Sequence, residues 1–172
     1  MGAPLVIVMG VSGSGKTTVG VRLAERLGVP FQEGDDLHDA ASIERMRQGL
    51  PLDDAARGPW LARIGAWLDA RLASEGGGVI TCSALRVAAR EGLRRDGVRF
   101  VYLRVPAPTL VSRVLTRHHP FMPPTLLPSQ LAAFEEPTPD EGVLTVEATG
   151  DVDANVARIV TLLGATRRRK EV

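Results

Sequence analysis

A glycine-rich segment directly behind a short apolar run constrains the fold of this chain more than any other feature. Residues 5–9 read Leu-Val-Ile-Val-Met, the composition of a buried strand, and residues 10–17 read Gly-Val-Ser-Gly-Ser-Gly-Lys-Thr. Val19, Leu23 and Leu27 then recur at helical spacing. Two glycines separated by four residues and followed by Lys and Thr, between a strand and a helix, are typical of a phosphate-binding loop.

Each residue type in this loop has a physical task. The glycines let the backbone turn tightly and bring its N–H groups against phosphate oxygens, and the helix that begins near Gly15 directs its positive dipole end at the same anion. Lys16 can reach the β- and γ-phosphates, and the Thr17 hydroxyl can ligate Mg²⁺. The flanking strand and helix disfavour the alternative, a turn that binds nothing. We therefore predict that ATP or GTP is bound by Gly10, Ser12, Gly13, Ser14, Gly15, Lys16, Thr17 and Thr18.

The composition is that of an ordinary globular domain. The chain has 172 residues, of which 44% are hydrophobic and 24% charged, and its net charge of +1 does not suggest a nucleic-acid-binding protein. A single cysteine, Cys82, excludes an internal disulfide framework and a cysteine-based zinc cluster. The first apolar run is too short to cross a bilayer and has no charged segment before it, so we expect a cytoplasmic protein that binds no membrane. We expect one domain over residues 1–165 and a solvated, frayed basic tail over residues 166–172.

Apolar runs that alternate with helical patterns predict the rest of the fold. Further strands are expected at residues 31–33, 79–82, 98–103 and 143–146. Helices are expected between them, among them residues 40–48, 57–74 and 152–163 and a helix that opens at residue 83. In the helix over residues 57–74, Pro59 suggests where the regular part begins. This alternation predicts one three-layer α/β/α domain with a parallel five-stranded sheet.

Acidic residues and a histidine follow the second predicted strand. Residues 34–38 read Gly-Asp-Asp-Leu-His and lie at the carboxyl end of that strand, where parallel α/β sheets bind their ligands. Asp35, Asp36 and His38 are therefore candidates for substrate contact. Asp35 and Asp36 could equally serve to cap the helix that follows.

A basic helix end runs into a proline-rich stretch near residue 120. Arg113 and Arg117 precede residues 120–128, which contain four prolines and cannot form one regular helix. We predict a mobile lid over the phosphates at about residues 117–128. Arginines also line the helix predicted from residue 83. They are Arg86, Arg90, Arg94 and Arg95. A row of arginines on a helix is usually a solvated face, but the first turns of this helix can face the cleft.

Several further motifs combine with the phosphate loop into a more specific pattern. They are Pro51-Leu52-Asp53-Asp54, Pro59-Trp60-Leu61, Cys82-Ser83-Ala84-Leu85, Phe121-Met122-Pro123 and a Ser-Gln pair after them. Together with the Gly-Asp-Asp-Leu-His segment, their order and spacing resemble gluconokinases of the phosphate-loop type, from residue 10 to about residue 137. The resemblance implies the nucleoside monophosphate kinase fold and ATP-dependent phosphorylation of D-gluconate at its 6-hydroxyl. It also implies a closing lid, Mg²⁺ and commonly a homodimer.

The resemblance assigns roles to particular residues. Asp35 would accept a hydrogen bond from the attacking hydroxyl, as orienter or general base, Lys16 would hold the β/γ-phosphates, and Arg117 would reach the transferred phosphoryl group. Arg113 is the backup for Arg117 and a candidate on the nucleotide side. The anionic, hydroxyl-rich acceptor calls for cations and hydroxyl-binding groups, for which the candidates are His38, Arg45 and Arg90.

Some positions depart from the family pattern. Arginines stand at positions 45 and 86, where lysines are usual, and Ala56 replaces an acidic residue before the family arginine, here Arg57. Ala89 replaces a tyrosine, and residues 119–121 read His-Pro-Phe in place of Gly-His-Phe. The alternatives are a related small-molecule kinase for another sugar acid or shikimate, and a regulatory protein that binds nucleotide without transfer.

Overall fold

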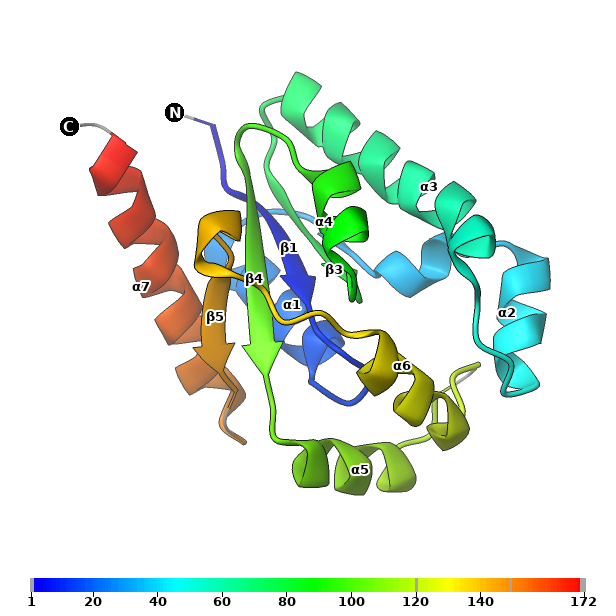
Figure 1. Cartoon of the computed structure of the whole chain (residues 1–172). Helices are drawn as coiled ribbons and strands as arrows, with labels where there is room; N and C mark the ends of the chain where they lie inside the picture. Colours follow the sequence, from blue (N-terminus) through cyan, green and yellow to red (C-terminus); the bar gives the residue numbers. More distant parts are fainter. Residues whose placement is uncertain (1, 120, 149, 171–172) are drawn as a thin grey trace.

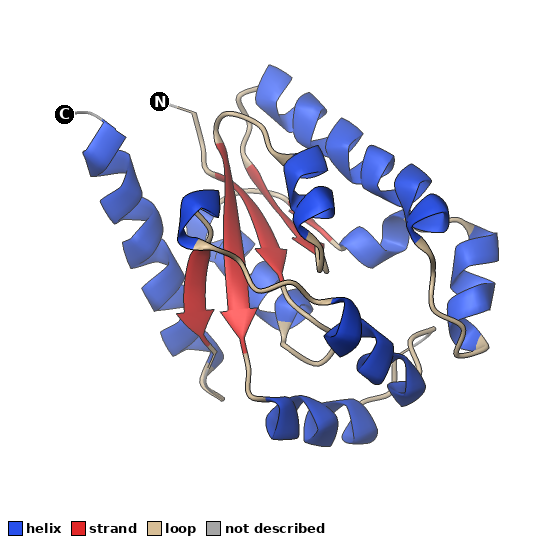
Figure 2. Ribbon diagram, viewed as in Figure 1, coloured by secondary structure: helices blue, strands red, loops and turns tan. Residues whose placement is uncertain are grey.

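Five parallel strands form a sheet at the centre of the molecule (Figures 1 and 2). The computed structural model describes residues 2–119, 121–148 and 150–170, with side chains described through residue 165. The strand order is β2-β3-β1-β4-β5. The strands are β1 (Leu5–Met9), β2 (Phe31–Gln32), β3 (Gly78–Cys82), β4 (Val98–Arg104) and β5 (Leu144–Glu147).

Helices cover both faces of the sheet, as Figure 1 shows. On one face lie α3 and α4, on the other α1 and α7, while α5 and α6 lie beyond the carboxyl ends of the strands. The α-helices are α1 (Lys16–Leu27), α2 (Ala40–Arg47), α3 (Asp54–Ala73), α4 (Val87–Leu93), α5 (Ala107–Thr116), α6 (Leu127–Ala133) and α7 (Val152–Lys170). Three short 3-10 helices complete the described elements, η1 (Gly34–Leu37), η2 (Pro124–Leu126) and η3 (Pro139–Glu141). The predicted three-layer α/β/α fold with five parallel strands is confirmed.

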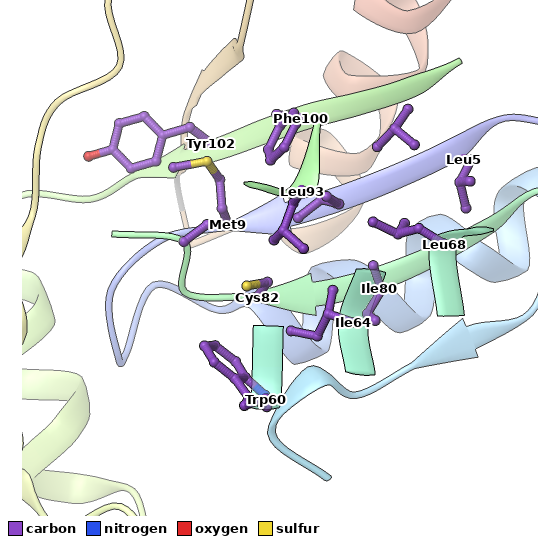
Figure 3. Packing of buried hydrophobic residues seen from close by; sticks show 13 residues of the cluster. Leu5, Met9, Trp60, Ile64, Leu68, Ile80, Cys82, Leu93, Phe100 and Tyr102 are labelled. Carbon is purple, nitrogen blue, oxygen red and sulfur yellow. The ribbon is translucent and has the colours of Figure 1, made fainter. Parts of the chain in front are cut away.

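Strand β1 is buried on both sides, and its alternating side chains supply both cores. Leu5, Ile7 and Met9 pack toward α3 and α4, in the cluster that Figure 3 shows. Val6 and Val8 pack on the opposite face against α1 and α7. Met9 pairs in register with Cys82 of β3 and with Tyr102 of β4. The three central strands therefore deliver their following loops to the same edge of the sheet.

Two helix starts differ from the predictions. Helix α3 begins at Asp54 rather than near Arg57 or Pro59, because the Asp53 carboxylate accepts a hydrogen bond from Ala56 N at 2.8 Å and caps the helix there. Pro59 is thus inside the helix. Helix α4 begins at Val87, and residues 83–86 remain irregular, with Ala84 in the left-handed region at φ 44°.

Helix α7 continues through residue 170, whereas the sequence predicted its end near residue 163 and a frayed tail beyond residue 165. Residues 171 and 172 lie outside the described part of the chain. Among the described residues, no helix is both long and apolar enough to cross a membrane.

Candidate active site

The phosphate loop connects β1 to α1 and depends on glycine backbone conformations. Gly10, Gly13 and Gly15 have φ angles of 150°, 82° and 91°, which disfavour any side chain. A Cβ on Gly13 would also lie 2.7 Å from Val114 of α5. Lys16, the first residue of α1, donates from Nζ to Val11 O at 3.2 Å, which folds its side chain back over the loop.

Beside the loop, the Thr17 hydroxyl donates to Glu33 Oε2 at 2.6 Å. The other oxygen of Glu33 accepts from the Thr81 hydroxyl at the end of β3. Sequence reasoning missed Glu33, although it directly precedes the predicted Gly-Asp-Asp-Leu-His segment. Its carboxylate is therefore fixed beside Thr17, the residue predicted to ligate the metal.

Asp35 is placed in the cleft by a close contact between η1 and β3. Gly34 N donates to Thr81 Oγ1 at 2.9 Å, and a Cβ on Gly34 would lie 1.8 Å from Thr81 O, so only glycine fits there. The capping alternative for Asp35 and Asp36 is wrong, because α2 is capped by Asp39, whose Oδ1 accepts from Ser42 N at 2.7 Å. Asp35 remains available to the site.

The Asp35 carboxyl is largely buried, with 16% of its side chain exposed. Burial raises its pKa to about 6, while the nearby Lys16 ammonium opposes that rise. Desolvation likewise lowers the pKa of Lys16. A carboxylate that titrates near neutral pH and lies close to the phosphate loop has the properties of a general base.

His119 also faces Asp35, with its Nε2 3.8 Å from Asp35 Oδ2. Its Nδ1 accepts from the backbone N–H groups of Phe121 and Met122, at 3.3 and 3.1 Å, which places the ring proton of the neutral form on Nε2. Residues 119–121 depart from the family pattern, and no role for this histidine was predicted from the sequence. The structure brings it into the site. Pro120 itself lies outside the described residues.

Next to Asp35 is a small pocket, which we call the acceptor pocket. Its volume of about 40 Å³ has room for only a few water molecules. His38 lines it, is 9% exposed and stacks on Trp60 with ring centroids 4.4 Å apart. Burial lowers the pKa of His38 to about 4, so the ring is neutral at physiological pH. Among the described residues its buried Nδ1 has no hydrogen-bond partner, so a hydrogen bond from a ligand hydroxyl would satisfy it.

A larger pocket of about 480 Å³, the outer pocket, adjoins the acceptor pocket. Arg57 of α3 lines both, as do Trp60, Ser83 and Leu85. The Arg57 side chain is 23% exposed, and its contact with Asp54 is a single one at 3.8 Å. Its guanidinium therefore has donors to spare at the junction of the two pockets.

A third pocket, the phosphate pocket, contains Lys16, Thr17, Arg117 and His119 as well as Asp35. A fourth, of about 410 Å³, lies on the other side of the loop and is lined by Thr18, Arg113, Arg117 and residues at the start of α7. Arg113 also donates from Nη1 to Gly13 O at 3.3 Å. The predicted phosphate and nucleotide residues are thus assembled around one loop, with Arg117 between the two pockets.

The predicted lid lies across the cleft. Leu126, Phe121 and Met122 pack with Met46 of α2 and with Leu52, so the segment after residue 120 reaches from α5 to α2. It forms one wall of the acceptor pocket through Met122, Leu126, Ser129 and Gln130. In this conformation the pocket has room for only a few water molecules, and this segment forms one of its walls.

Comparison with known proteins agrees with this geometry. Residues 6–121 match a family model described as an AAA domain. The chain is 46% identical to the gluconokinase of Gluconobacter oxydans over 157 residues, which cover 90% of this chain and 88% of that protein. This chain belongs to the gluconokinase family. Its function class is therefore that of an enzyme, a kinase that uses ATP.

Solved structures support the assignment of this gluconokinase-family chain. A gluconokinase from Sinorhizobium meliloti is 38% identical and superposes with a TM-score of 0.79, covering 95% of this chain and 97% of that one. An unliganded sugar kinase from Janibacter sp. is 39% identical, with a TM-score of 0.86 and coverage of 94% and 95%. The resemblance that the sequence motifs suggested is confirmed.

Within this family framework, the structure does not support the prediction that Arg90 binds substrate. Arg90 is fully buried and pairs with Glu141, through Nε to Oε2 at 2.6 Å and Nη2 to Oε1 at 3.0 Å. Its Nη1 donates to Ala84 O and Leu85 O at 3.0 and 3.2 Å. Four of its five N–H donors are thus directed at protein atoms, so Arg90 holds the strained loop after β3 in place rather than facing the cleft.

Arg45 is also placed away from the acceptor. It lies on the exposed side of α2 and donates from Nε to Pro51 O at 3.1 Å, and it lines none of the pockets described above. Arg57, by contrast, lines both the outer and the acceptor pocket. The sequence contained one signal for it, the family arginine behind Ala56, but helical spacing alone does not distinguish a cleft-facing arginine from a solvated one.

Proposed function

We propose that this chain transfers the γ-phosphoryl group of ATP to the 6-hydroxyl of D-gluconate. The choice of acceptor rests on one observation. The outer pocket shares lining residues with the acceptor pocket, and the acceptor pocket shares lining residues with the phosphate pocket. Arg57 lines the outer and acceptor pockets, and Asp35 lines the acceptor and phosphate pockets. A linear hydroxy acid whose carboxylate binds Arg57 would extend its far, terminal hydroxyl toward Asp35 and the phosphates.

The chemistry asks the protein mainly for positioning and charge stabilisation. Asp35, ionised above pH 6, would accept the proton of the attacking hydroxyl. Lys16 and Arg117 would stabilise the charge on the transferred phosphoryl group. The neutral His38 would bind an acceptor hydroxyl without repelling or attracting its carboxylate, and Arg57 would hold that carboxylate by a charge-assisted fork.

The residues present also fit a magnesium ion. In the part of the chain that is described, no three His, Cys, Asp or Glu side chains form a metal cage. Mg²⁺ in kinases needs none, because phosphates and water supply most of its ligands. Thr17 would hold the ion through its hydroxyl oxygen, with Glu33 orienting that hydroxyl from behind. The ion would neutralise phosphate charge during transfer.

A panel of acceptors tests the proposal. Purified protein is mixed with ATP, Mg²⁺ and, in turn, D-gluconate, other aldonic acids or shikimate, and ADP release is followed with product analysis by mass spectrometry and ³¹P NMR. With gluconate we expect a rate of ADP release well above the rate at which the protein hydrolyses ATP without an acceptor. The product should carry its phosphate on the terminal carbon of gluconate. A greater rate with another acid, and none with gluconate, would assign a different acceptor to the same site.

Asp35→Asn is the control in this assay. It removes the proton acceptor but keeps the shape, so transfer to gluconate should fall by about 10²–10⁴-fold while ATP affinity is retained. Equal damage to ATP binding and to transfer would move Asp35 to a structural or metal-organising role.

Assembly and location stay predictions. From the resemblance we expect a homodimer, and from the net charge and the short first apolar run we expect a cytoplasmic protein with no nucleic-acid or membrane partner. Light scattering behind a sizing column would give the mass of the particle, and a value for one chain of 18.4 kDa would contradict the dimer.

A further inference from the structure

Gln130 of α6 lies at the boundary where the phosphate and acceptor pockets meet. Four residues line both pockets: Asp35, Ser83, Met122 and Gln130. Asp35 is the predicted proton acceptor, Met122 has no N–H or O–H in its side chain, and Ser83 offers a single hydroxyl. The side chain of Gln130 is different, because its amide carries two strong donors and one strong acceptor. Neither the motif reading nor the family resemblance assigned it a role.

The orientation of the Gln130 amide is fixed by the phosphate loop. Ser12 N donates to Gln130 Oε1 at 2.7 Å. A backbone N–H can only donate, so the atom that faces it must be the side-chain oxygen, and the opposite orientation of the amide is excluded. The Nε2 hydrogens therefore point away from Ser12 toward the rest of the pocket.

The Nε2 group has little to bind in the protein. Its described contact is Met122 Sδ at 3.8 Å, and a thioether is a weak acceptor. Gln130 is half-buried, so its donors have limited access to water. Two N–H hydrogens held in a fixed direction at a phosphate pocket, with a replaceable partner, are suited to an anionic oxygen.

We propose that Gln130 is a catalytic residue that donates from Nε2 to an oxygen of the transferred phosphoryl group. It acts together with Lys16 and Arg117, which line the same pocket, and adds a neutral donor where negative charge is spread over the phosphoryl oxygens. Anionic oxygens are better acceptors than the attacking hydroxyl, whose lone pair is needed for bond formation. Gln130 forms no covalent bond and moves no proton. The proposal deepens the proposed kinase function and rests on it.

Two variants separate the donor from the tie to Ser12. Gln130→Glu keeps an acceptor for Ser12 N but loses the amide donor, whereas Gln130→Met loses both. We measure kcat and KM for gluconate, the Kd for ATP and the melting temperature of each. The matched control is Gln48→Glu, the same chemical change on the exposed end of α2, where Gln48 Nε2 contacts only Glu44 among the residues described.

We expect both Gln130 variants to lower kcat by about 10²-fold, the cost of one transition-state donor. KM for gluconate, ATP affinity and melting temperature should stay close to the wild type, and Gln48→Glu should match the wild type throughout. A loss of kcat in Gln130→Met alone would reduce Gln130 to a structural tie to Ser12. A loss in Gln130→Glu alone would point to the added charge. A change in KM without kcat would make it an acceptor ligand. Each of these three overturns the proposal.

Hydrolysis of ATP without an acceptor separates this proposal from the proposed function. Water then replaces the acceptor hydroxyl, but the phosphoryl group to be stabilised is the same. If the wild type gives no transfer to gluconate but both variants slow hydrolysis by a similar factor, the acceptor assignment fails and the role of Gln130 stands. If gluconate is phosphorylated and both variants keep the wild-type rates, the acceptor assignment stands and the proposed role of Gln130 fails.

Discussion

The two halves of this cleft are built by different means. The phosphate half is built around one continuous segment, residues 10–18, whose shape depends on glycine backbone conformations, and Arg117 and His119 complete it from the segment after α5. The acceptor half is assembled from side chains on separate elements: Asp35 on η1, Arg57 on α3, Ser83 after β3 and Met122 after α5. A backbone site tolerates changes around it, whereas a side-chain site can be altered one residue at a time.

This difference explains where a kinase of this fold can change its substrate. The phosphate half must bind the same group in every turnover, and its geometry is fixed by φ angles and by the packing of Gly13 against α5. The acceptor half has an adjoining pocket of about 480 Å³ and a wall made by the segment after residue 120. Substitutions there, such as Ala89 on the wall of the outer pocket, change the space without touching the phosphates.

The largest expected effect of removing a cation is in the phosphate half. Lys16→Ala should lower kcat by about 10³-fold, because it removes a cation from the transferred phosphoryl group. The fold should be unchanged, since Lys16 makes one described hydrogen bond, to Val11 O. Rapid-quench kinetics, with circular dichroism for the fold, would measure this. A normal kcat with normal ATP binding would remove Lys16 from the mechanism.

A stability effect should distinguish the support of the acceptor half. Arg90→Met leaves the buried carboxylate of Glu141 unpaired and frees the carbonyls of Ala84 and Leu85, so unfolding in urea should show a loss of about 3–5 kcal/mol. Adding Glu141→Leu should recover part of it. The control is Arg95→Ala, which breaks an exposed pair with Asp69 and should cost about 1 kcal/mol or less. If Arg90→Met lost no more unfolding free energy than Arg95→Ala, Arg90 would not be the residue that holds the loop after β3 in place.

The same contrast decides how much the sequence could predict. The phosphate loop was predictable because its residues are contiguous and each has a backbone or charge requirement. Glu33, Arg57, His119 and Gln130 were not, because their roles depend on contacts between residues 16 to 118 positions apart, as in the Thr17–Glu33 and Ser12–Gln130 hydrogen bonds. Arg90 shows the opposite error. Its position near a strand end suggested that its side chain faces the cleft, but it forms a buried ion pair with Glu141, 51 residues away in the sequence.

Two arginines give a smaller, paired test of the acceptor half. Arg57→Ala should raise KM for gluconate by about 10- to 100-fold, the value of a charge-assisted hydrogen bond, and leave the Kd for ATP unchanged. Arg45→Ala should change KM by less than about twofold, because that guanidinium donates to Pro51 O on the exposed side of α2. Initial rates with gluconate varied, and calorimetry with an ATP analogue, would measure both. If the two variants exchanged these effects, the carboxylate would bind on α2 and not at the junction of the pockets.

The smallest effect is a pH dependence that separates activity from stability. Asp35, with its pKa raised from 3.8 to about 6 by burial, must be ionised to accept a proton, so the rate should fall about tenfold per pH unit below pH 6. Both substrates are kept well below their KM values, so that the profile reports the free enzyme. Asp35→Asn should lose this acid limb and keep only its low residual rate. An acid limb near pH 6 that persists in the variant would belong to another group.

Stability should respond differently over the same range, because two buried groups act in opposite directions. The folded state holds the Asp35 proton more tightly than the unfolded chain does, so this group destabilises the fold as pH rises from about 4 to 6. His38, with its pKa lowered from 6.5 to about 4, binds its proton more tightly when unfolded and destabilises the fold as pH falls through that window.

The two effects largely cancel in the wild type, so its melting temperature should change little from these groups while its activity declines. In Asp35→Asn only the His38 contribution remains, and its melting temperature should fall more steeply toward pH 4.5 than that of the wild type. Parallel melting curves for the two proteins would mean that Asp35 and His38 do not form such an opposed pair.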